Sequence, residues 1–147
     1  MTPADNLVPE IAQRPRPRLY RRLAPVLARR ATAVGVIAAL EGPLRYTVGD
    51  YVCLGILHEE WPVAAARFEA SHRQVSTPDD AGYAQYEQIH PIRARQMRRP
   101  FTIINEQGEP LAGKAGDYRA TTFNGLRYVI DAQVFGLTYA RVHEARR

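Results

Sequence analysis

The stretch TVGDYVCLGILHEEWPV, residues 47–63, is written a second time, with changes, as KAGDYRATTFNGLRYVI at residues 114–130. The two Gly-Asp-Tyr triplets begin at Gly49 and Gly116, so the offset between the stretches is 116 − 49 = 67 residues. The same offset of 67 also aligns later residues of the two stretches. The matched pairs are Trp61/Tyr128, Val63/Ile130, Ala65/Ala132, Phe68/Phe135, Ser71/Thr138 and Val75/Val142.

A second match lies upstream of each stretch. YRRLAPVLARR, residues 20–30, aligns with YEQIHPIRARQ, residues 86–96, at an offset of 86 − 20 = 66. The offsets differ by one, so the second copy carries one extra residue in its middle. Two collinear blocks in the same order indicate a tandem duplication. Copies of roughly 60 residues are too small to be secure alone, so we expect them to pack on each other about a pseudo-twofold axis.

The repeated stretch predicts a β-hairpin. Asn124-Gly125 stands between two β-rich runs and is typical of a tight type I′ turn. The first copy has Leu57-His58-Glu59-Glu60 near this place, so we expect its hairpin to turn differently. Ahead of each strand, Gly supplies an unusual backbone angle, and the Asp side chain can accept a backbone N–H hydrogen bond.

A short helical turn should follow each hairpin. Residues 64–72 and 131–139 fit it, with Asp131 as N-cap and Phe68 and Phe135 directed into the core. A last strand would close each unit. The Pro25 and Pro91 blocks read as opening strands, and residues 42–48 and 101–113 add further strand, the latter with a turn at NEQGEP. The predicted fold is therefore α+β, mostly β: two tandem copies of a small antiparallel β unit with a short helix.

We divide the chain into an extended or mobile tail (1–19), a first repeat (20–75), a linker (76–85) and a second repeat (86–147). It is 46% hydrophobic and 24% charged, a globular balance. The single cysteine, Cys53, excludes an internal disulfide. No secretory h-region is evident, and the longest apolar stretch, residues 31–40, is far short of the ~20 residues that span a bilayer. We expect a cytoplasmic protein without membrane contact.

The Gly-Asp-Tyr strand opening, the Trp61-Pro62-Val63 step and the YRRLAPV block together resemble the PGDYG-type small proteins of phage, prophage and bacterial genomes. Both copies share the resemblance. Val48 and Ala115 stand where that family has its first proline, and Val52 and Arg119 where it has its closing glycine. The resemblance implies a fold and a phage or mobile-element setting, and it implies no biochemical activity.

Catalytic and metal-binding signatures are weak. Cys53, His58 and His72 could supply three metal ligands, or Cys53, His58 and Glu60 an unrecognised catalytic site. The second copy has Ala120, Gly125 and Tyr139 at the places of Cys53, His58 and His72, so that metal set is not part of the repeated design. The sequence favours a non-enzymatic protein with neither metal nor cofactor.

The repeated motif residues allow two interpretations. Asp50 and Asp117 could be symmetric functional carboxylates where the copies meet, or turn caps, and we favour the caps. The other motif residues are interpreted as packing or turn positions. The full set is Gly49, Asp50, Tyr51, Trp61, Phe68, Gly116, Asp117, Tyr118, Tyr128 and Phe135.

Arginine clusters give the best remaining binding signal. The net charge is +5, from 20 basic and 15 acidic residues. Arginine suits bidentate phosphate contacts, although the bias also fits the base composition of coding DNA. The candidates for a phosphate-bearing ligand or a nucleic acid are Arg21, Arg22, Arg29, Arg30, Arg93, Arg95, Arg98 and Arg99.

The sequence thus favours a binding or accessory module of phage type, with a ligand or partner held between the repeats. The alternatives are a nucleic-acid-associated protein that uses its arginine clusters, and a small enzyme with a site near Cys53. A homodimer or a complex with another protein also remains open.

Overall fold

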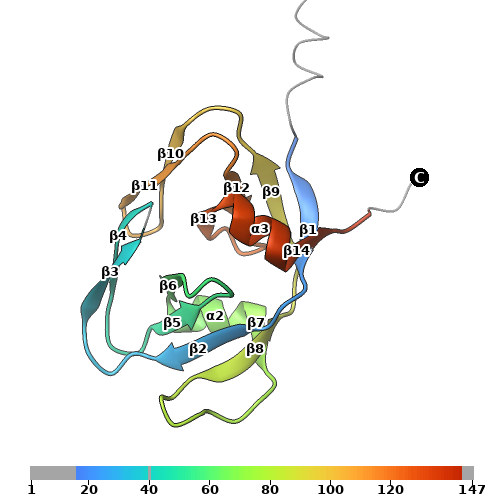
Figure 1. Ribbon diagram of the computed structural model, residues 1–147. Coiled ribbons are helices and arrows are strands. Elements are labelled where there is room, and N and C mark those ends of the chain that lie inside the picture. Colours follow the sequence, from blue (N-terminus) through green and yellow to red (C-terminus); the bar gives the residue numbers. More distant parts are fainter. Residues whose placement is uncertain (1–15, 40, 144–147) are drawn as a thin grey trace, which may run out of the picture.

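The computed structural model describes residues 16–39 and 41–143. This part of the chain is mostly β, with antiparallel sheets and two short helices (Figure 1). The α+β, mostly-β prediction is confirmed. No helix among the described residues is both long and apolar enough to cross a bilayer.

The elements follow one another in the same order in the two halves of the chain. The first half comprises β1 (Arg18–Arg22), β2 (Val26–Arg30), β3 (Gly35–Ala39), β4 (Gly42–Tyr46), β5 (Tyr51–Leu54), β6 (Glu60–Val63), α2 (Ala65–Ser71) and β7 (His72–Gln74). The second half comprises β8 (Ala84–Gln88), β9 (Ile92–Gln96), β10 (Phe101–Ile104), β11 (Pro110–Gly113), β12 (Tyr118–Thr121), β13 (Arg127–Ile130), α3 (Ala132–Thr138) and β14 (Tyr139–Arg141).

Each half gives its first strand to the other half's sheet. The first sheet has the order β6-β5-β2-β8-β7, and the second sheet has the order β13-β12-β9-β1-β14. β1 therefore lies between β9 and β14, and β8 lies between β2 and β7 (Figure 1). In both sheets the exchanged strand is an inner strand. Neither residues 20–75 nor residues 86–147 can therefore form a complete sheet alone.

Strand registers correspond between the two sheets. Tyr20 on β1 lies opposite Ile92 on β9, just as Tyr86 on β8 lies opposite Val26 on β2. The hairpins β3–β4 and β10–β11 also correspond, and they locate the extra residue. Residues 105–109 separate the paired residues Ile104 and Pro110, whereas only residues 39–42 separate Ala38 and Pro43. The additional residue of the second half thus lies in the β10–β11 turn.

Several boundaries differ from the sequence prediction. β1 begins at Arg18, inside the segment assigned to the tail (1–19), whose residues 1–15 lie outside the described part. β8 begins at Ala84, inside the segment assigned to the linker (76–85). Pro25 and Pro91 lie at strand entrances, as predicted, because β2 begins at Val26 and β9 at Ile92, but the residues before each proline belong to a further strand in the other sheet. These differences share one cause: pairing with the far half of the chain extends each first strand, and local sequence does not report it.

Both Gly-Asp turns have the capping geometry that the sequence indicates. The Thr47 N–H donates to Asp50 Oδ2 at 2.9 Å, and the Lys114 N–H donates to Asp117 Oδ2 at 3.1 Å. Gly49 and Gly116 have φ angles of 93° and 95°, a region that favours glycine. The turn at each strand entrance is therefore built from local side-chain and backbone bonds.

The β5–β6 and β12–β13 turns are alike, so the prediction of different turns is wrong. His58 N–H donates to Gly55 O at 3.0 Å, and Gly125 N–H donates to Thr122 O at 3.0 Å. Gly125 has a φ of 86°, and His58 adopts the same left-handed region with a φ of 63°. Asn124 has no positive φ, which excludes the predicted type I′ turn. Three residues, not two, form each loop, and a single left-handed residue closes it.

His58 is a non-glycine residue in a region where side chains are disfavoured. We expect His58→Gly to raise the free energy of unfolding by up to about 1 kcal/mol, because the strain of the left-handed angle is relieved. Urea denaturation monitored by circular dichroism measures the change. The matched control, Gly125→Ala, should lower the free energy by a similar amount; a His58→Gly variant less stable than the wild type would contradict the argument.

The helices and their phenylalanines form as predicted. Asp131 caps α3 by accepting hydrogen bonds from the Gln133 and Val134 N–H groups. Phe68 and Phe135 are buried. Phe68 stacks on Tyr51 with ring centroids 4.2 Å apart, and Phe135 stacks on Tyr118 at 3.6 Å. Each helix thus packs one aromatic ring onto one face of its sheet.

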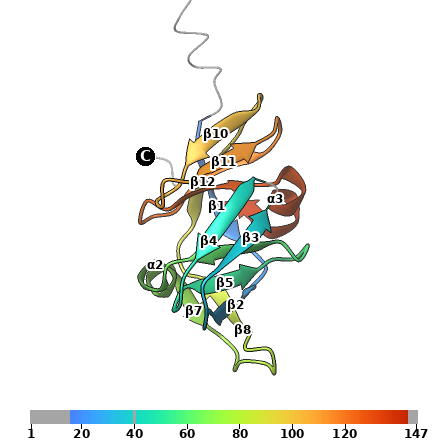
Figure 2. The same cartoon turned by 90° about the vertical axis from the view of Figure 1, so that its left-hand side faces the viewer.

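One core cluster, the central core cluster, joins the two halves. It contains buried residues from both hairpins and both sheets: Ala31, Ile37, Leu44, Val52, Ile103, Leu111 and Val129. The hairpins β3–β4 and β10–β11 lie on the same side of the molecule (Figure 2). They meet at an edge, where the Ala112 N–H donates to Glu41 O at 2.8 Å. Burial at this junction makes the two sheets one structural unit.

Candidate functional site

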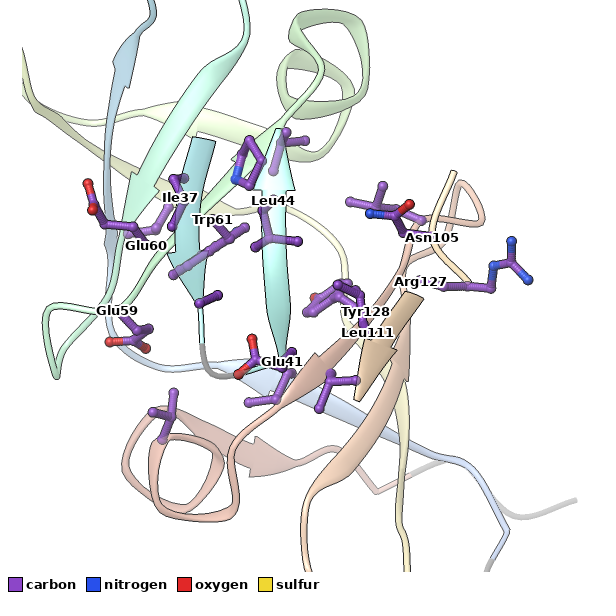
Figure 3. A pocket seen from close by; sticks show the side chains of 18 of the residues that line it. Ile37, Glu41, Leu44, Glu59, Glu60, Trp61, Asn105, Leu111, Arg127 and Tyr128 are labelled. Atoms are coloured by element: carbon purple, nitrogen blue, oxygen red, sulfur yellow. The ribbon is translucent and has the colours of Figure 1, made fainter. Parts of the chain in front are cut away.

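A cavity of about 560 Å³ lies between the two halves (Figure 3). Both sheets, both hairpins and both helices or their flanking residues contribute to its wall. Its size falls within the range of small-molecule sites. The apolar and aromatic part of the wall includes Ile37, Leu44, Leu111, Val129, Trp61 and Tyr128.

Trp61 and Tyr128 provide the large flat surfaces. They occupy matching positions, because Trp61 lies opposite Cys53 on β5 and Tyr128 lies opposite Ala120 on β12. Trp61 lies beside Ile37 and Leu44 of the first hairpin, and Tyr128 lies beside Leu111 of the second (Figure 3). Burial raises the pKa of Tyr128 well above its ordinary value, so its phenol stays neutral.

Arg22 places a guanidinium in the cavity wall. It is the last residue of β1, and its Nε donates to Ala24 O at 2.9 Å. The guanidinium carbon lies 5.8 Å from the Trp61 ring centroid and 5.7 Å from that of Tyr139. Its Nη2 is buried and has no hydrogen-bond partner among the described residues. The guanidinium group of Arg22 therefore contacts two aromatic rings, while its Nη2 group donates to no acceptor of the described chain.

Gln88 occupies the matching position in the other sheet. It ends β8 and lies opposite His72, as Arg22 lies opposite Tyr139. Its Oε1 is buried and has no partner in the part of the chain described. The strands β1 and β8 contact each other. The exchange of first strands therefore brings a donor and an acceptor to one cavity from distant parts of the sequence.

Glu59 adds a second acceptor at the β5–β6 turn. Its Oε1 accepts from the Leu57 N–H at 2.8 Å, while its Oε2 is buried without a partner in residues 16–39 and 41–143. The carboxylate lies over Gly55, where a Cβ would collide with it. Arg22 Nη2, Gln88 Oε1 and Glu59 Oε2 are the three such side-chain atoms found in the described chain, and all three residues line the cavity.

The charge of the lining is acidic on balance. Five carboxyl side chains line it, from Glu41, Glu59, Glu60, Glu106 and Asp131, against three guanidinium groups, from Arg22, Arg67 and Arg127. Two of the acids are paired outside the central space. Glu106 lies 3.8 Å from Arg127, which extends away from the cavity in Figure 3, and Asp131 lies 2.9 Å from Lys114.

Glu41 lies at the tip of the first hairpin, close to the Ala112 backbone. Burial is the main reason that its pKa is raised, and the nearby Asp117 and Asp131 carboxylates raise it further. At a given pH, this carboxyl group is therefore protonated more often than an exposed glutamate. The excess of carboxyl over guanidinium side chains in the lining still disfavours a phosphate in the cavity.

Cys53 belongs to both the candidate metal set, with His58 and His72, and the candidate enzyme site, with His58 and Glu60, and it lies in the core. Cys53 is 1% exposed, and burial raises the pKa of its thiol, which keeps the nucleophilic thiolate from forming. His72 stacks on Phe68 with centroids 4.1 Å apart, and burial lowers its pKa to about 4. No group of three or more His, Cys, Asp or Glu residues in the described segments is arranged to hold a metal. The geometry argues against an active site centred on Cys53.

The arginine candidates do not form one site. Arg22 alone among them lines the central cavity. Arg29 donates to the Tyr83 hydroxyl at 3.3 Å, and Arg30 donates to Gly49 O at 2.9 Å. Arg95 lies opposite Arg119 in the second sheet. The exposed members are Arg21, Arg30, Arg93, Arg98 and Arg99.

Sequence reasoning missed most of the cavity. The sequence interpretation gives Trp61 and Tyr128 a packing role, although they occupy matching positions in the two similar stretches. Nothing in the sequence indicates that Gln88, Glu41 and Glu59 line a cavity. Gln88 matches Arg22 at the offset of 66, but a change from Arg to Gln between copies carries no meaning until the strand exchange brings both residues to one wall.

Comparison with known proteins gives no relative: no family model, no curated protein and no solved structure matches the chain.

Proposed function

We propose that the protein is a non-enzymatic binding module that holds a small molecule in the cavity between its two halves. One observation carries the proposal: a cavity of about 560 Å³ lies between the two halves, and Trp61 and Tyr128 line it from matching positions of the two sheets. A cavity of this size, with a mostly apolar wall and a few polar groups, is typical of small-molecule sites.

The proposal includes the origin of the cavity. The chain is a tandem duplication whose halves are related by an approximate twofold axis. Matching strand registers and the reciprocal exchange of β1 and β8 support this relation. Duplication creates a shared cavity without any need for catalytic residues. Four expectations remain predictions: membership of the PGDYG-type family, a phage setting, nucleic-acid binding through the arginine clusters, and a homodimer.

A cavity-filling substitution tests the binding function. We expect ligand-observed NMR with a library of small molecules to find compounds that compete for one site on the wild-type protein. Ala39 lines the cavity and is partly buried, so Ala39→Phe should abolish their binding by occupying the space.

The matched control is Ala33→Phe, which places the same side chain on an exposed residue outside the lining. It should keep the binding of every compound. Circular dichroism of both variants checks that the fold is retained. Hits that still bind to a folded Ala39→Phe protein, or a library without any hit, would overturn the proposed function.

A further inference from the structure

The second sheet differs from the first in its charge. The strands of the first sheet carry three arginines and two glutamates. The strands of the second sheet carry eight arginines and no aspartate or glutamate. An unbalanced positive charge of this size suits a polyanion. The eight residues are Arg18, Arg21, Arg22, Arg93, Arg95, Arg119, Arg127 and Arg141.

The strand register places four of these arginines together on one face of the sheet. Residues directly opposite each other share a face, and side chains alternate between faces along a strand. Arg119 lies opposite Arg95, and Arg93 lies opposite Leu19. Arg21 is two positions beyond Leu19 and therefore lies on the same face. We call the surface formed by Arg21, Arg93, Arg95 and Arg119 the basic face.

The basic face is accessible and lies outside the cavity. Arg21, Arg93 and Arg119 are exposed. Neither Arg21 nor Arg119 forms an ion pair with an acidic side chain of the described chain. Arg127 shares the face at its β13 edge, but it pairs with Glu106 at 3.8 Å and lines the cavity. The four arginines of the basic face do not line the cavity, so this surface is separate from the proposed small-molecule site.

The first sheet has no equivalent surface. Its register pairs Arg29 with Val52, as the second sheet pairs Arg95 with Arg119. Val52 is 0% exposed and belongs to the central core cluster, whereas Arg119 is exposed. The position that the first sheet uses for its core therefore carries a charge in the second sheet.

Arginine favours phosphate as the anion. A guanidinium group offers a planar set of donors that can bond to two phosphate oxygens at once. Arg95 and Arg119 lie directly opposite each other, and such like charges on neighbouring strands are unfavourable. An anion that contacts both side chains offsets this repulsion.

The uncharged side chains of the sheet indicate which phosphates fit. Its aromatic residues lie on the other face, where Tyr20 and Tyr118 pack against Phe135, so bases find no aromatic ring to stack on at the basic face. No large apolar side chain is exposed on its strands, and membrane-binding surfaces use such side chains as anchors. The surface is therefore better matched to a sugar–phosphate backbone than to bases or lipids.

We propose that the basic face binds the phosphate backbone of a nucleic acid without reading its sequence. Arg119, which was not among the arginines selected from the sequence, belongs to this surface, whereas Arg29 and Arg30 lie in the other sheet. The binding is independent of any ligand in the cavity.

Fluorescence anisotropy with a labelled DNA duplex of about 20 base pairs tests the proposal. Four phosphate contacts predict a slope of about −3 to −4 for the logarithm of the association constant against the logarithm of salt concentration. Affinity should therefore fall about a hundredfold between about 50 and 200 mM salt. A second duplex of unrelated sequence should bind equally well, because phosphate contacts carry no sequence information.

Two double variants that remove the same charge tie binding to this surface. Arg21→Gln/Arg119→Gln should weaken binding at about 100 mM salt by at least about tenfold and make the slope shallower by about two. The matched control is Arg45→Gln/Arg141→Gln. Arg45 is an exposed residue of β4, and Arg141 is an exposed residue on the other face of the second sheet, opposite Tyr20. The control should keep the wild-type slope.

Circular dichroism checks that both double variants fold, and the single substitutions replace a double variant that does not. Equal losses of affinity in the two folded double variants would overturn the proposal, because net charge alone would then explain binding. The absence of binding at about 50 mM salt, or a slope shallower than about −1, would overturn it as well. Vesicles of phosphatidylserine and phosphatidylcholine test the other polyanion: binding to them that Arg21→Gln/Arg119→Gln abolishes, without DNA binding, would assign the surface to membranes instead.

Discussion

Tyr20→Ala is expected to lower the free energy of unfolding by about 3 kcal/mol, and to do so for both halves of the molecule. Tyr20 belongs to the first half of the chain, but its ring packs in the second sheet. It lies edge-on to Phe135, with centroids 4.7 Å apart, and to Tyr118 at 6.3 Å. Truncation leaves a cavity beneath α3 and removes two aromatic contacts.

The single tryptophan, Trp61, lets this prediction be tested in the first sheet alone. Trp61 lies on β6 in the first sheet, far along the chain from the rings that Tyr20 contacts. Because β1 and β8 are exchanged and the central core cluster draws on both halves, we expect one cooperative transition. In urea, the midpoint of Trp61 fluorescence should fall together with that of circular dichroism.

Leu23→Ala is the control for this measurement. Leu23 follows β1 and is 66% exposed, so the substitution should change the free energy of unfolding by less than about 0.5 kcal/mol. A Tyr20→Ala protein whose Trp61 midpoint stays at the wild-type value, while circular dichroism shows an earlier partial loss, would mean that the halves unfold independently.

Asp117→Ala should have a similarly large effect, lowering the free energy of unfolding by about 3 kcal/mol. The Asp117 side chain is buried, with the residue 4% exposed. Its carboxylate accepts from the Lys114 N–H at 3.1 Å, the Lys114 Nζ at 3.0 Å and the Ala132 N–H at 3.1 Å. Alanine leaves two backbone donors without their acceptor, one at the turn before β12 and one at the start of α3.

Asp50→Ala is the matched comparison. Asp50 occupies the same turn in the first half, is half-buried, and accepts from the Thr47 N–H at 2.9 Å. Asp50→Ala should lower the free energy of unfolding by about 1 kcal/mol, the usual contribution of one capping hydrogen bond. Urea denaturation of both variants gives the comparison. Equal losses would show that the additional bonds of Asp117 do not contribute, and that both residues act as turn caps alone.

Much of the local structure follows from the sequence, because local bonds decide it. The Gly-Asp turns, the Asp131 cap, the two short helices and the burial of Phe68 and Phe135 depend on residues a few positions apart. The β5–β6 turn shows where local rules fail. His58 adopts a left-handed angle that its residue type disfavours, because the strands on either side fix the length of the loop.

The sequence by itself determined a mostly β chain with two Gly-Asp turns and one aromatic anchor per helix, because turn chemistry and capping depend on neighbouring residues. Only the tertiary structure decided which sheet each first strand joins. That choice depends on pairing between residues more than 60 positions apart, as between Tyr20 and Ile92. The cavity depends on the same choice, because Arg22 and Gln88 reach its wall only when β1 and β8 have changed places.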